Sequence, residues 1–366
     1  MIIGVPKELK SGEARVGITP DSANVVIKLG HQVILEKNAG ILSGFSDSEY
    51  LQVGVKILDN YEQIWSHSDL LLKVKEPALE ERKLFRKGQT IFSFLHPASD
   101  KHLVENLLSS KSIGISFDTL RDEKGLFPIL TPMSLIAGQL SVYAGSFALQ
   151  PINGGRGVLL GGDDFPSANV LIVGAGAAGT AAARTAIGVG ANVCVLDINS
   201  TKIDYYNSLG EKVRGLVSNK ENLEEELLNT DLLIGAVYVA SDLAPKLIHK
   251  NHLSSMRKGA AIVDICIDQG GFAETSRATS ISNPTYIEQN IVHYCVPNMP
   301  AQVPRSSTIA LNNAVMPWLL QILKNGSVKS IETNPAIKSG LVTYDGKLVN
   351  PTVAKALNLP HSEWQQ

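Results

Sequence analysis

The chain has few cysteines, no long apolar run and no excess of positive charge. The three cysteines among its 366 residues, Cys194, Cys266 and Cys295, lie in apolar segments and lack metal-ligand spacing. They predict buried free thiols in a reducing cytoplasm. No apolar run reaches the roughly 18 residues of a membrane span. The N-terminus lacks the apolar region and cleavage site of a signal peptide.

The charge balance and the composition exclude further classes of protein. The formal net charge is −2, which leaves no basic surplus for a nucleic-acid backbone. Hydrophobic residues make up 44% and charged residues 19% of the chain, as in an ordinary globular protein. A prior of about 150 residues per domain predicts two domains. We therefore expect a cytoplasmic protein with neither a nucleic-acid nor a membrane partner.

The segment from Val170 to Asp197 is the most informative part of the sequence. An apolar, β-branched run leads into Gly174-x-Gly176-x-x-Gly179, a small-residue helix follows, and a second apolar run ends on Asp197. The first glycine allows a sharp turn, the second lets a pyrophosphate approach the backbone, and the third lets helix and strand pack closely. This is the Rossmann dinucleotide fingerprint in its full context. The alternative is a glycine-rich turn in an ordinary α/β domain.

Asp197 indicates which dinucleotide binds. It follows the last fingerprint glycine at close to the spacing expected for a carboxylate that binds the ribose hydroxyls. Its charge would repel a 2′-phosphate, and no arginine follows it directly. The sequence therefore favours NAD over NADP.

Strand-like and helix-like runs alternate along most of the chain, which is typical of parallel sheets with crossover helices. A helix is predicted to begin at the Thr19 N-cap and Pro20 and to stop at Gly30. Another is predicted over residues 304–323. Further strands are predicted over residues 32–36, 69–74, 90–95, 112–117, 232–237, 260–265 and 291–296.

These elements predict an α/β protein of two Rossmann-like domains with parallel sheets. We expect residues 1–128 and 306–366 to form a discontinuous substrate and catalytic domain, and residues 129–305 to form the inserted NAD-binding domain. Ligands of such sheets bind beyond the carboxyl ends of the strands. The active site is therefore expected in the cleft between the domains.

Three polar residues follow predicted strand ends: Lys75, His96 and Asp268. Such a set could bind a carboxylate or carbonyl, transfer protons and orient water. Singly, each has a plainer explanation, namely a solvated lysine, a structural histidine and a turn-forming aspartate. Arg15 lies in a loop, where its guanidinium could bind a carboxylate in two hydrogen bonds, or pair with Glu13 on the surface.

The remaining histidines show no metal-ligand pairing, and no metal site is expected. His293 and Cys295 lie inside an apolar run and are expected in the core.

The ordered motifs over nearly the whole chain resemble those of the alanine dehydrogenase family, which is related to the nucleotide-binding part of proton-translocating transhydrogenase. They are IGVPKE, RVGITP, GFSDSEY, KVKEP, FLHPASD, LTPMS, the fingerprint, VLDIN, DLLIGAV, IVDICIDQGG and HYCVPNMPAQVPRSST.

The resemblance implies an enzyme that oxidatively deaminates L-alanine to pyruvate and ammonia with NAD, runs the reverse reaction, and forms a homo-oligomer, typically a hexamer. It also implies a role for each matching residue. Arg15 and Lys75 would hold the substrate, and His96 and Asp268 would handle protons. Ser134 would contact the cofactor phosphates, Asp197 the adenine ribose, and Asn298 would lie near the nicotinamide and the substrate.

Some positions depart from the family pattern. Leu135 and Gln139 replace a common Glu and Arg four residues apart on a predicted helix, which we interpret as a lost ion pair. Pro97 replaces a common Leu, Phe117-Asp118 a common Tyr-Glu, and the loop around residues 240–243 differs. These changes leave the implied chemistry intact.

Three other functions remain open on the sequence. The chain could be a dehydrogenase of a larger amino acid, of the lysine or saccharopine type. It could be a non-catalytic nucleotide-binding subunit of a transhydrogenase, or a nucleotide sensor without activity. The presence of Arg15, Lys75, His96 and Asp268 favours an enzyme.

Overall fold

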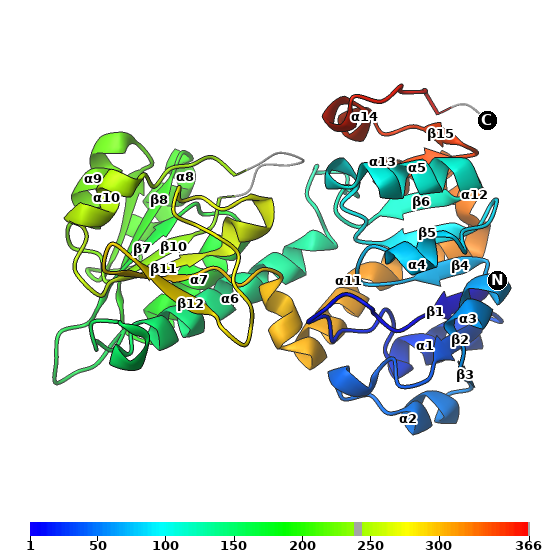
Figure 1. The fold of residues 1–366 in the computed structure, drawn as a ribbon, viewed down its shortest axis with the longest axis horizontal. Helices are drawn as coiled ribbons and strands as arrows, with labels where there is room; N and C mark the ends of the chain where they lie inside the picture. The colour runs from blue at the N-terminus through cyan, green and yellow to red at the C-terminus, as the bar shows by residue number, and fades with distance from the viewer. Residues whose placement is uncertain (238–243, 365–366) are drawn as a thin grey trace. The chain divides into compact units, whose positions relative to one another are not determined.

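The computed structural model describes residues 1–237 and 244–364. The chain divides into two compact units, the first Met1–Met133 with Ala301–Gln366 and the second Ser134–Pro300. Figure 1 shows the first unit in blue, cyan, orange and red, so that both ends of the chain belong to it, and the second in green and yellow. The boundaries expected from sequence lay at 128/129 and 305/306. The first observed boundary falls inside a continuous helix, where the sequence has no break.

The first unit contains an eight-stranded, mostly parallel sheet in the order β15-β14-β6-β5-β4-β1-β2-β3. Strands β14 and β15 extend it at one edge in antiparallel orientation. The C-terminal part of the chain therefore completes a sheet that the N-terminal part begins. The strands are β1 (Ile2–Val5), β2 (Gln32–Glu36), β3 (Lys56–Leu58), β4 (Leu70–Leu72), β5 (Thr90–Ser93), β6 (Ile113–Ser116), β14 (Leu341–Tyr344) and β15 (Lys347–Leu348).

Helices connect these strands, and α6 (Leu130–Ala148) runs across the boundary into the second unit. The first helix begins as predicted: the Thr19 hydroxyl accepts a hydrogen bond from the Ser22 N–H at 3.2 Å, and Pro20 is the first helical residue. The helices of this unit are α1 (Pro20–Lys28), α2 (Asp47–Gln52), α3 (Tyr61–His67), α4 (Leu79–Arg82), α5 (Lys101–Ser110), α11 (Pro304–Asn325), α12 (Ser327–Thr333), α13 (Pro335–Gly340) and α14 (Pro351–Leu357), with 3-10 turns η1 (Ile41–Ser43) and η2 (Pro97–Ser99).

The second unit contains a seven-stranded sheet in the order β12-β13-β11-β10-β7-β8-β9, parallel except for β12. Its elements are β7 (Asn169–Val173), β8 (Asn192–Asp197), β9 (Val213–Val217), β10 (Leu232–Gly235), β11 (Ala261–Asp264), β12 (Thr285–Glu288), β13 (Ile291–Tyr294), α7 (Ala177–Gly188), α8 (Ser200–Asn207), α9 (Lys220–Leu227), α10 (Lys250–Ser255), and the 3-10 turns η3 (Pro151–Asn153) and η4 (Ile265–Gln269); η5 (Met299–Gln302) crosses the second boundary.

Strand β7 shows why its sequence is continuously apolar. Val170 and Ile172 belong to one hydrophobic cluster of the second unit, whereas Leu171 and Val173 belong to another. Successive side chains point to opposite faces of a strand, so both faces of this sheet are buried. The apolar run therefore carries the fingerprint directly out of the middle of a rigid core.

The predicted two-domain α/β fold with mostly parallel sheets is confirmed. Each strand predicted above contains an observed strand, and β2 (Gln32–Glu36) matches residue for residue. The two predicted helices begin at the predicted residues, and α11 ends at Asn325, two residues later than predicted. The sequence analysis missed β3, β9, β12, β14 and β15. These strands are short, or carry exposed or half-exposed side chains, so they lack the continuous apolar run by which the central strands were recognised.

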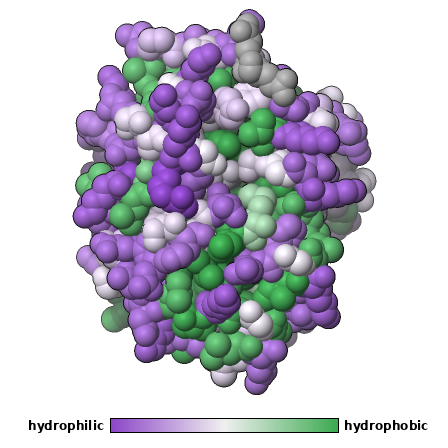
Figure 2. Space-filling view, turned by 90° about the vertical axis from the view of Figure 1, so that its right-hand side faces the viewer, coloured by the Kyte–Doolittle hydropathy of each residue, from purple (hydrophilic) through white to green (hydrophobic). Residues whose placement is uncertain are grey.

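The face seen in Figure 2 is mostly hydrophilic, with hydrophobic residues gathered in its lower half among hydrophilic ones. Within residues 1–237 and 244–364, no helix combines the length and the apolar character that a membrane crossing needs.

Candidate active site

The fingerprint turn joins β7 to α7, and its three glycines meet three different constraints. Gly174 has a φ of +98°, in the left-handed region that favours glycine. A Cβ on Gly179 would lie 1.7 Å from the carbonyl oxygen of Gly174, so any side chain there would clash with backbone. A Cβ on Gly176 would meet nothing within 4 Å. Gly176 is the N-cap of α7, and the open space before a helix N-terminus suits a phosphate group.

Asp197 ends β8 beside this turn. Its Oδ2 accepts a hydrogen bond of 2.6 Å from the N–H of Ala175, within the glycine turn, and its Oδ1 accepts one of 2.9 Å from Asn199. Lys202, on α8, lies 3.7 Å from the same carboxylate. The carboxylate is thus fixed at the carboxyl ends of β7 and β8, where a fold of this kind binds a dinucleotide.

Lys75 and His96 are brought together in the first unit. They follow the neighbouring parallel strands β4 and β5, and Lys75 Nζ lies 3.5 Å from His96 Nε2. The carboxyl ends of parallel strands meet at one edge of the sheet, which places these distant residues side by side. Lys75 is buried and His96 is half-buried. An ammonium beside an imidazole can hold an anionic oxygen while the imidazole exchanges a proton.

The surroundings of His96 fix both its place and its charge. Burial lowers the pKa of His96 below its ordinary value of 6.5; Asp118 opposes this shift, and Lys75 adds to it. His96 itself has a φ of +45°. Its N–H and that of Leu95 donate to Asp118 Oδ1 at 3.3 and 3.2 Å. The imidazole therefore stays neutral at neutral pH, as a proton acceptor requires.

Two carboxylates that support this edge were missed by the sequence analysis. Asp118 appeared there only as a departure from the family pattern, yet it holds the turn that carries His96. Glu8 was not singled out, yet it accepts hydrogen bonds from the N–H groups of Val74 and Lys75, at 2.7 and 3.3 Å. No local signal marks either residue, because each acts on a segment far away in sequence.

Arg15 is buried, so the alternative of a surface arginine is wrong. Its pairing with Glu13 is nevertheless present: Nε donates to Oε1 at 2.7 Å and Nη2 to Oε2 at 2.5 Å. Nη1 lies 3.2 Å from Met133 Sδ. Glu13 therefore holds the Nε–Nη2 edge of the guanidinium and fixes its orientation.

Asp268 and Asn298 are brought together in the second unit. Asp268 lies exposed in η4, directly after β11, and its Oδ2 accepts a hydrogen bond of 3.0 Å from the Asn298 N–H. Asn298 has a φ of +54°. Asp264, which the sequence analysis did not single out, holds the far end of the same loop: its Oδ2 accepts from Phe272 N–H at 2.9 Å and from Ser276 Oγ at 2.5 Å.

The other residues named from sequence occupy plainer positions. Ser134, Leu135 and Gln139 lie on α6, as the helix predicted for this segment requires. His293 and Cys295 are buried, which confirms the prediction that they belong to the core.

The state of the three cysteines follows from their burial. All three cysteines are buried free thiols, as predicted, and burial raises the pKa of Cys194 to about 12. In the described part of the chain, no group of three His, Cys, Asp or Glu side chains could hold a metal ion. The differing loop residues 240–243 lie outside the described residues.

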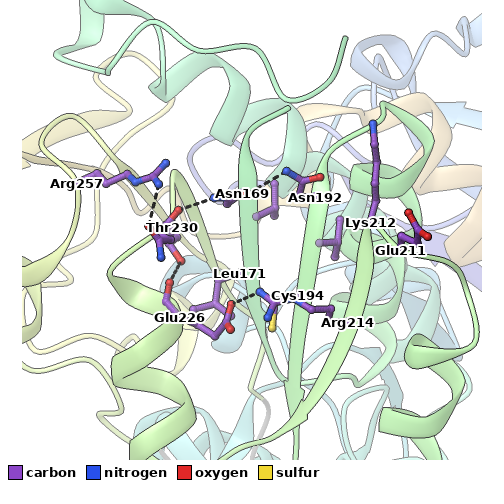
Figure 3. A pocket seen from close by; sticks show the side chains of 13 residues that line it. Asn169, Leu171, Asn192, Cys194, Glu211, Lys212, Arg214, Glu226, Thr230 and Arg257 are labelled. Atoms are coloured by element: carbon purple, nitrogen blue, oxygen red, sulfur yellow. Dashed lines mark hydrogen bonds and ion pairs between the residues drawn. The ribbon is translucent and has the colours of Figure 1, made fainter. Parts of the chain in front are cut away.

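A cavity of about 380 Å³ lies at the other end of the second sheet (Figure 3). Its walls come from the amino ends of β7, β8 and β9, opposite to the fingerprint. Arg214 contacts Glu226 at 2.8 Å, Arg257 donates to Asn229 Oδ1 at 2.9 Å, and Lys212 donates to Ser167 Oγ at 3.4 Å. This cavity is therefore not the candidate active site.

Known proteins resemble the chain over its full length. The family models "Alanine dehydrogenase/PNT, N-terminal domain" and "Alanine dehydrogenase/PNT, C-terminal domain" match residues 4–137 and 141–351. Alanine dehydrogenase of Staphylococcus saprophyticus is 42% identical over 99% of this chain and 98% of its own. A solved L-alanine dehydrogenase superposes with a TM-score of 0.94 at 41% identity, covering 98% of this chain and 99% of that one. A transhydrogenase from Sinorhizobium meliloti shares the fold, with a TM-score of 0.83 at 20% identity, covering 96% and 99%.

Proposed function

The chain belongs to the alanine dehydrogenase/PNT family, and we propose that it is an NAD-dependent L-alanine dehydrogenase. It would convert L-alanine to pyruvate and ammonia with formation of NADH, and catalyse the reverse reductive amination. The observation that carries this proposal is the Lys75–His96 pair, 3.5 Å apart at the ends of neighbouring strands, in a chain with a complete dinucleotide turn. A binding subunit alone would not need a neutral imidazole beside a buried ammonium.

The second unit would bind the cofactor. The free space at Gly176 fits a pyrophosphate, and Asp197 fits the ribose hydroxyls. Ser134 would add a hydroxyl for the phosphates, and Asn298 would lie near the nicotinamide. When bound, NAD accepts the hydride from the substrate Cα.

The first unit would bind the substrate. Arg15 would hold its carboxylate, with Glu13 fixing the guanidinium. Lys75 would place its ammonium on the carbonyl oxygen of pyruvate, which gains charge when ammonia adds to the carbonyl carbon. L-alanine offers only one methyl group, worth under about 1 kcal/mol by area. Its recognition must therefore come mainly from such charge-assisted contacts.

Two groups would handle protons. His96, neutral at neutral pH, would accept a proton in the oxidative direction, as water adds to the substrate imine. Asp268 would orient that water, or take up a proton as the carbinolamine releases ammonia. We also propose that the protein is cytoplasmic and forms a homo-oligomer, most simply a hexamer as the family implies. Light scattering after size-exclusion chromatography measures the oligomer directly.

One assay tests the proposed function. Purified chain is mixed with NAD and a panel of amino acids, including L-alanine, L-lysine and saccharopine, and NADH absorbance is followed. We expect L-alanine to give the highest kcat/KM, and NADP to give little turnover. Turnover of lysine or saccharopine in place of alanine would indicate the related dehydrogenases. No turnover with any amino acid, together with tight NADH binding, would indicate a binding subunit or sensor.

A further inference from the structure

A buried group of three charged side chains adjoins the segment that carries Lys75. Lys73 Nζ lies 3.3 Å from Glu8 Oε2 and 3.2 Å from Glu81 Oε1, and all three side chains are at most 3% exposed. Burial works to lower the pKa of Lys73, but the two carboxylates together raise it above its ordinary value. Lys73 is therefore charged. We refer to Glu8, Lys73 and Glu81 as the buried triad.

The triad carboxylates hold both ends of residues 74–78. Glu8 accepts hydrogen bonds from Val74 N–H at 2.7 Å and from Lys75 N–H at 3.3 Å, and Glu81 Oε2 accepts one from Ala78 N–H at 2.7 Å. Four of these five residues have an N–H group, because Pro77 has none. Three of the four donate to a triad carboxylate.

Stability alone does not explain such an arrangement. Removing charges from water destabilises the folded state, and apolar side chains of similar volume often replace a buried ion pair without loss of stability. What apolar side chains cannot supply is an acceptor for these N–H groups. Burial raises the pKa of Glu8, and the ammonium of Lys73 and the hydrogen bond from Val74 oppose this rise. The oxygens of Glu8 and Glu81 supply the acceptors.

We propose that the buried triad is a positioning device, which fixes the backbone of residues 74–78 and thereby holds Lys75 beside His96. The inference rests on the roles proposed above for Lys75 and His96. Glu8 and Glu81 are positioning residues, because they act through Lys75. A displacement of about 1 Å at such a site can cost about 10²-fold in rate.

The test compares two buried carboxylates, of which one is hydrogen-bonded to the segment that carries Lys75 and the other to a segment of the second unit. Glu8→Gln removes the charge that pairs with Lys73 and one acceptor of the two N–H groups. Asp231→Asn is the matched control: Asp231 is equally buried, accepts from Asn169 N–H at 2.9 Å and pairs with Arg156 at 2.9 Å. It lies in the second unit, near the amino end of its sheet. Both variants should lower the unfolding midpoint.

Two measurements separate positioning from stability. The first is the titration of His96 by NMR in the free protein, assigned with His96→Gln. Asp118, Lys75, Glu76 and Lys10 act on His96, and Lys75 lowers its pKa, so a displaced Lys75 should raise the pKa of His96. The second is turnover of L-alanine. In Glu8→Gln we expect this rise and a roughly tenfold to hundredfold lower kcat, with unchanged NADH affinity.

Asp231→Asn should match wild type in both measurements. The proposal is overturned if Glu8→Gln keeps the wild-type His96 titration and kcat, or if both variants lose kcat in step with their unfolding midpoints. If Glu8→Gln does not fold, Glu8→Asp decides: it keeps the charge but is about 1.5 Å shorter, so it should fold and still show the raised pKa. A wild-type titration in Glu8→Asp would overturn the proposal. If wild type does not oxidise L-alanine, the proposed function fails while the titration still tests the triad.

Discussion

Three glycines at and within α7 allow the nucleotide site to be tested, because the same glycine-to-alanine change should have a different effect at each of them. Gly176→Ala adds a methyl group to open space, and the backbone there, with φ −71° and ψ −166°, is accessible to alanine. Gly179→Ala places the same methyl 1.7 Å from a backbone oxygen. Gly188→Ala adds it at the exposed last residue of the helix, again to open space.

The geometry gives the expected magnitudes. Gly179→Ala requires the helix to move by over 1 Å, because ordinary contacts begin near 3.4 Å. Overpacking of this kind costs about 1–3 kcal/mol or more. At roughly 2–4 °C per kcal/mol for a unit of this size, the unfolding midpoint should fall by about 2–12 °C or more. Gly176→Ala should change stability by less than about 0.5 kcal/mol, and Gly188→Ala should raise it slightly.

The variant that weakens NADH binding should not be the variant that loses most stability. The methyl of Gly176→Ala would keep a pyrophosphate from the N–H groups of α7, and a hydrogen bond to a charged group is worth about 1.5–3 kcal/mol. The Kd for NADH, measured by fluorescence titration, should therefore rise roughly 10- to 150-fold. Gly188→Ala should bind NADH like wild type. A wild-type Kd in Gly176→Ala would refute the assignment of the pyrophosphate to this turn. Loss of folding in that variant would contradict the open space at Gly176.

Four further outcomes are expected. Asp197→Ala should weaken NAD binding and reduce the preference for NAD over NADP, measured as the ratio of kcat/KM with NAD to kcat/KM with NADP. An unchanged ratio would show that other residues select the cofactor. His96→Ala and Asp268→Asn should each lower kcat by about 10²-fold or more while NADH still binds, and near-normal turnover would remove that residue from the mechanism. Arg15→Lys should raise KM for pyruvate, and Lys75→Ala should raise KM and also lower kcat. An unchanged pyruvate KM in both variants would show that other residues bind the substrate. Because burial lowers the pKa of His96 below 6.5, the titration of its ring, followed by NMR in the free protein, should have its midpoint below that value, and a midpoint above it would contradict a neutral base at this position.

The sequence alone was sufficient for the central strands and the dinucleotide turn. The fingerprint glycines, Asp197 and the adjoining apolar run lie within one short segment, so their constraints are local: a left-handed φ at Gly174 and close backbone contact at Gly179. The N-cap at Thr19 was predictable for the same reason. Such local constraints can be predicted because the residues involved lie close together in the sequence.

The tertiary structure decided what lies beside the candidate catalytic residues. Lys75 and His96 are adjacent only because β4 and β5 pair in parallel. Arg15 is buried against Glu13 rather than exposed, and no sequence pattern gives the burial of a loop residue. Hydrogen bonds from neighbouring loops hold Glu8, Asp118 and Asp264 in place as supports of those loops. The partners of Glu8 lie more than sixty residues away in the sequence. Such contacts depend on how strands and loops assemble in three dimensions, because hydrogen bonding is set by distance in space and not by separation along the chain.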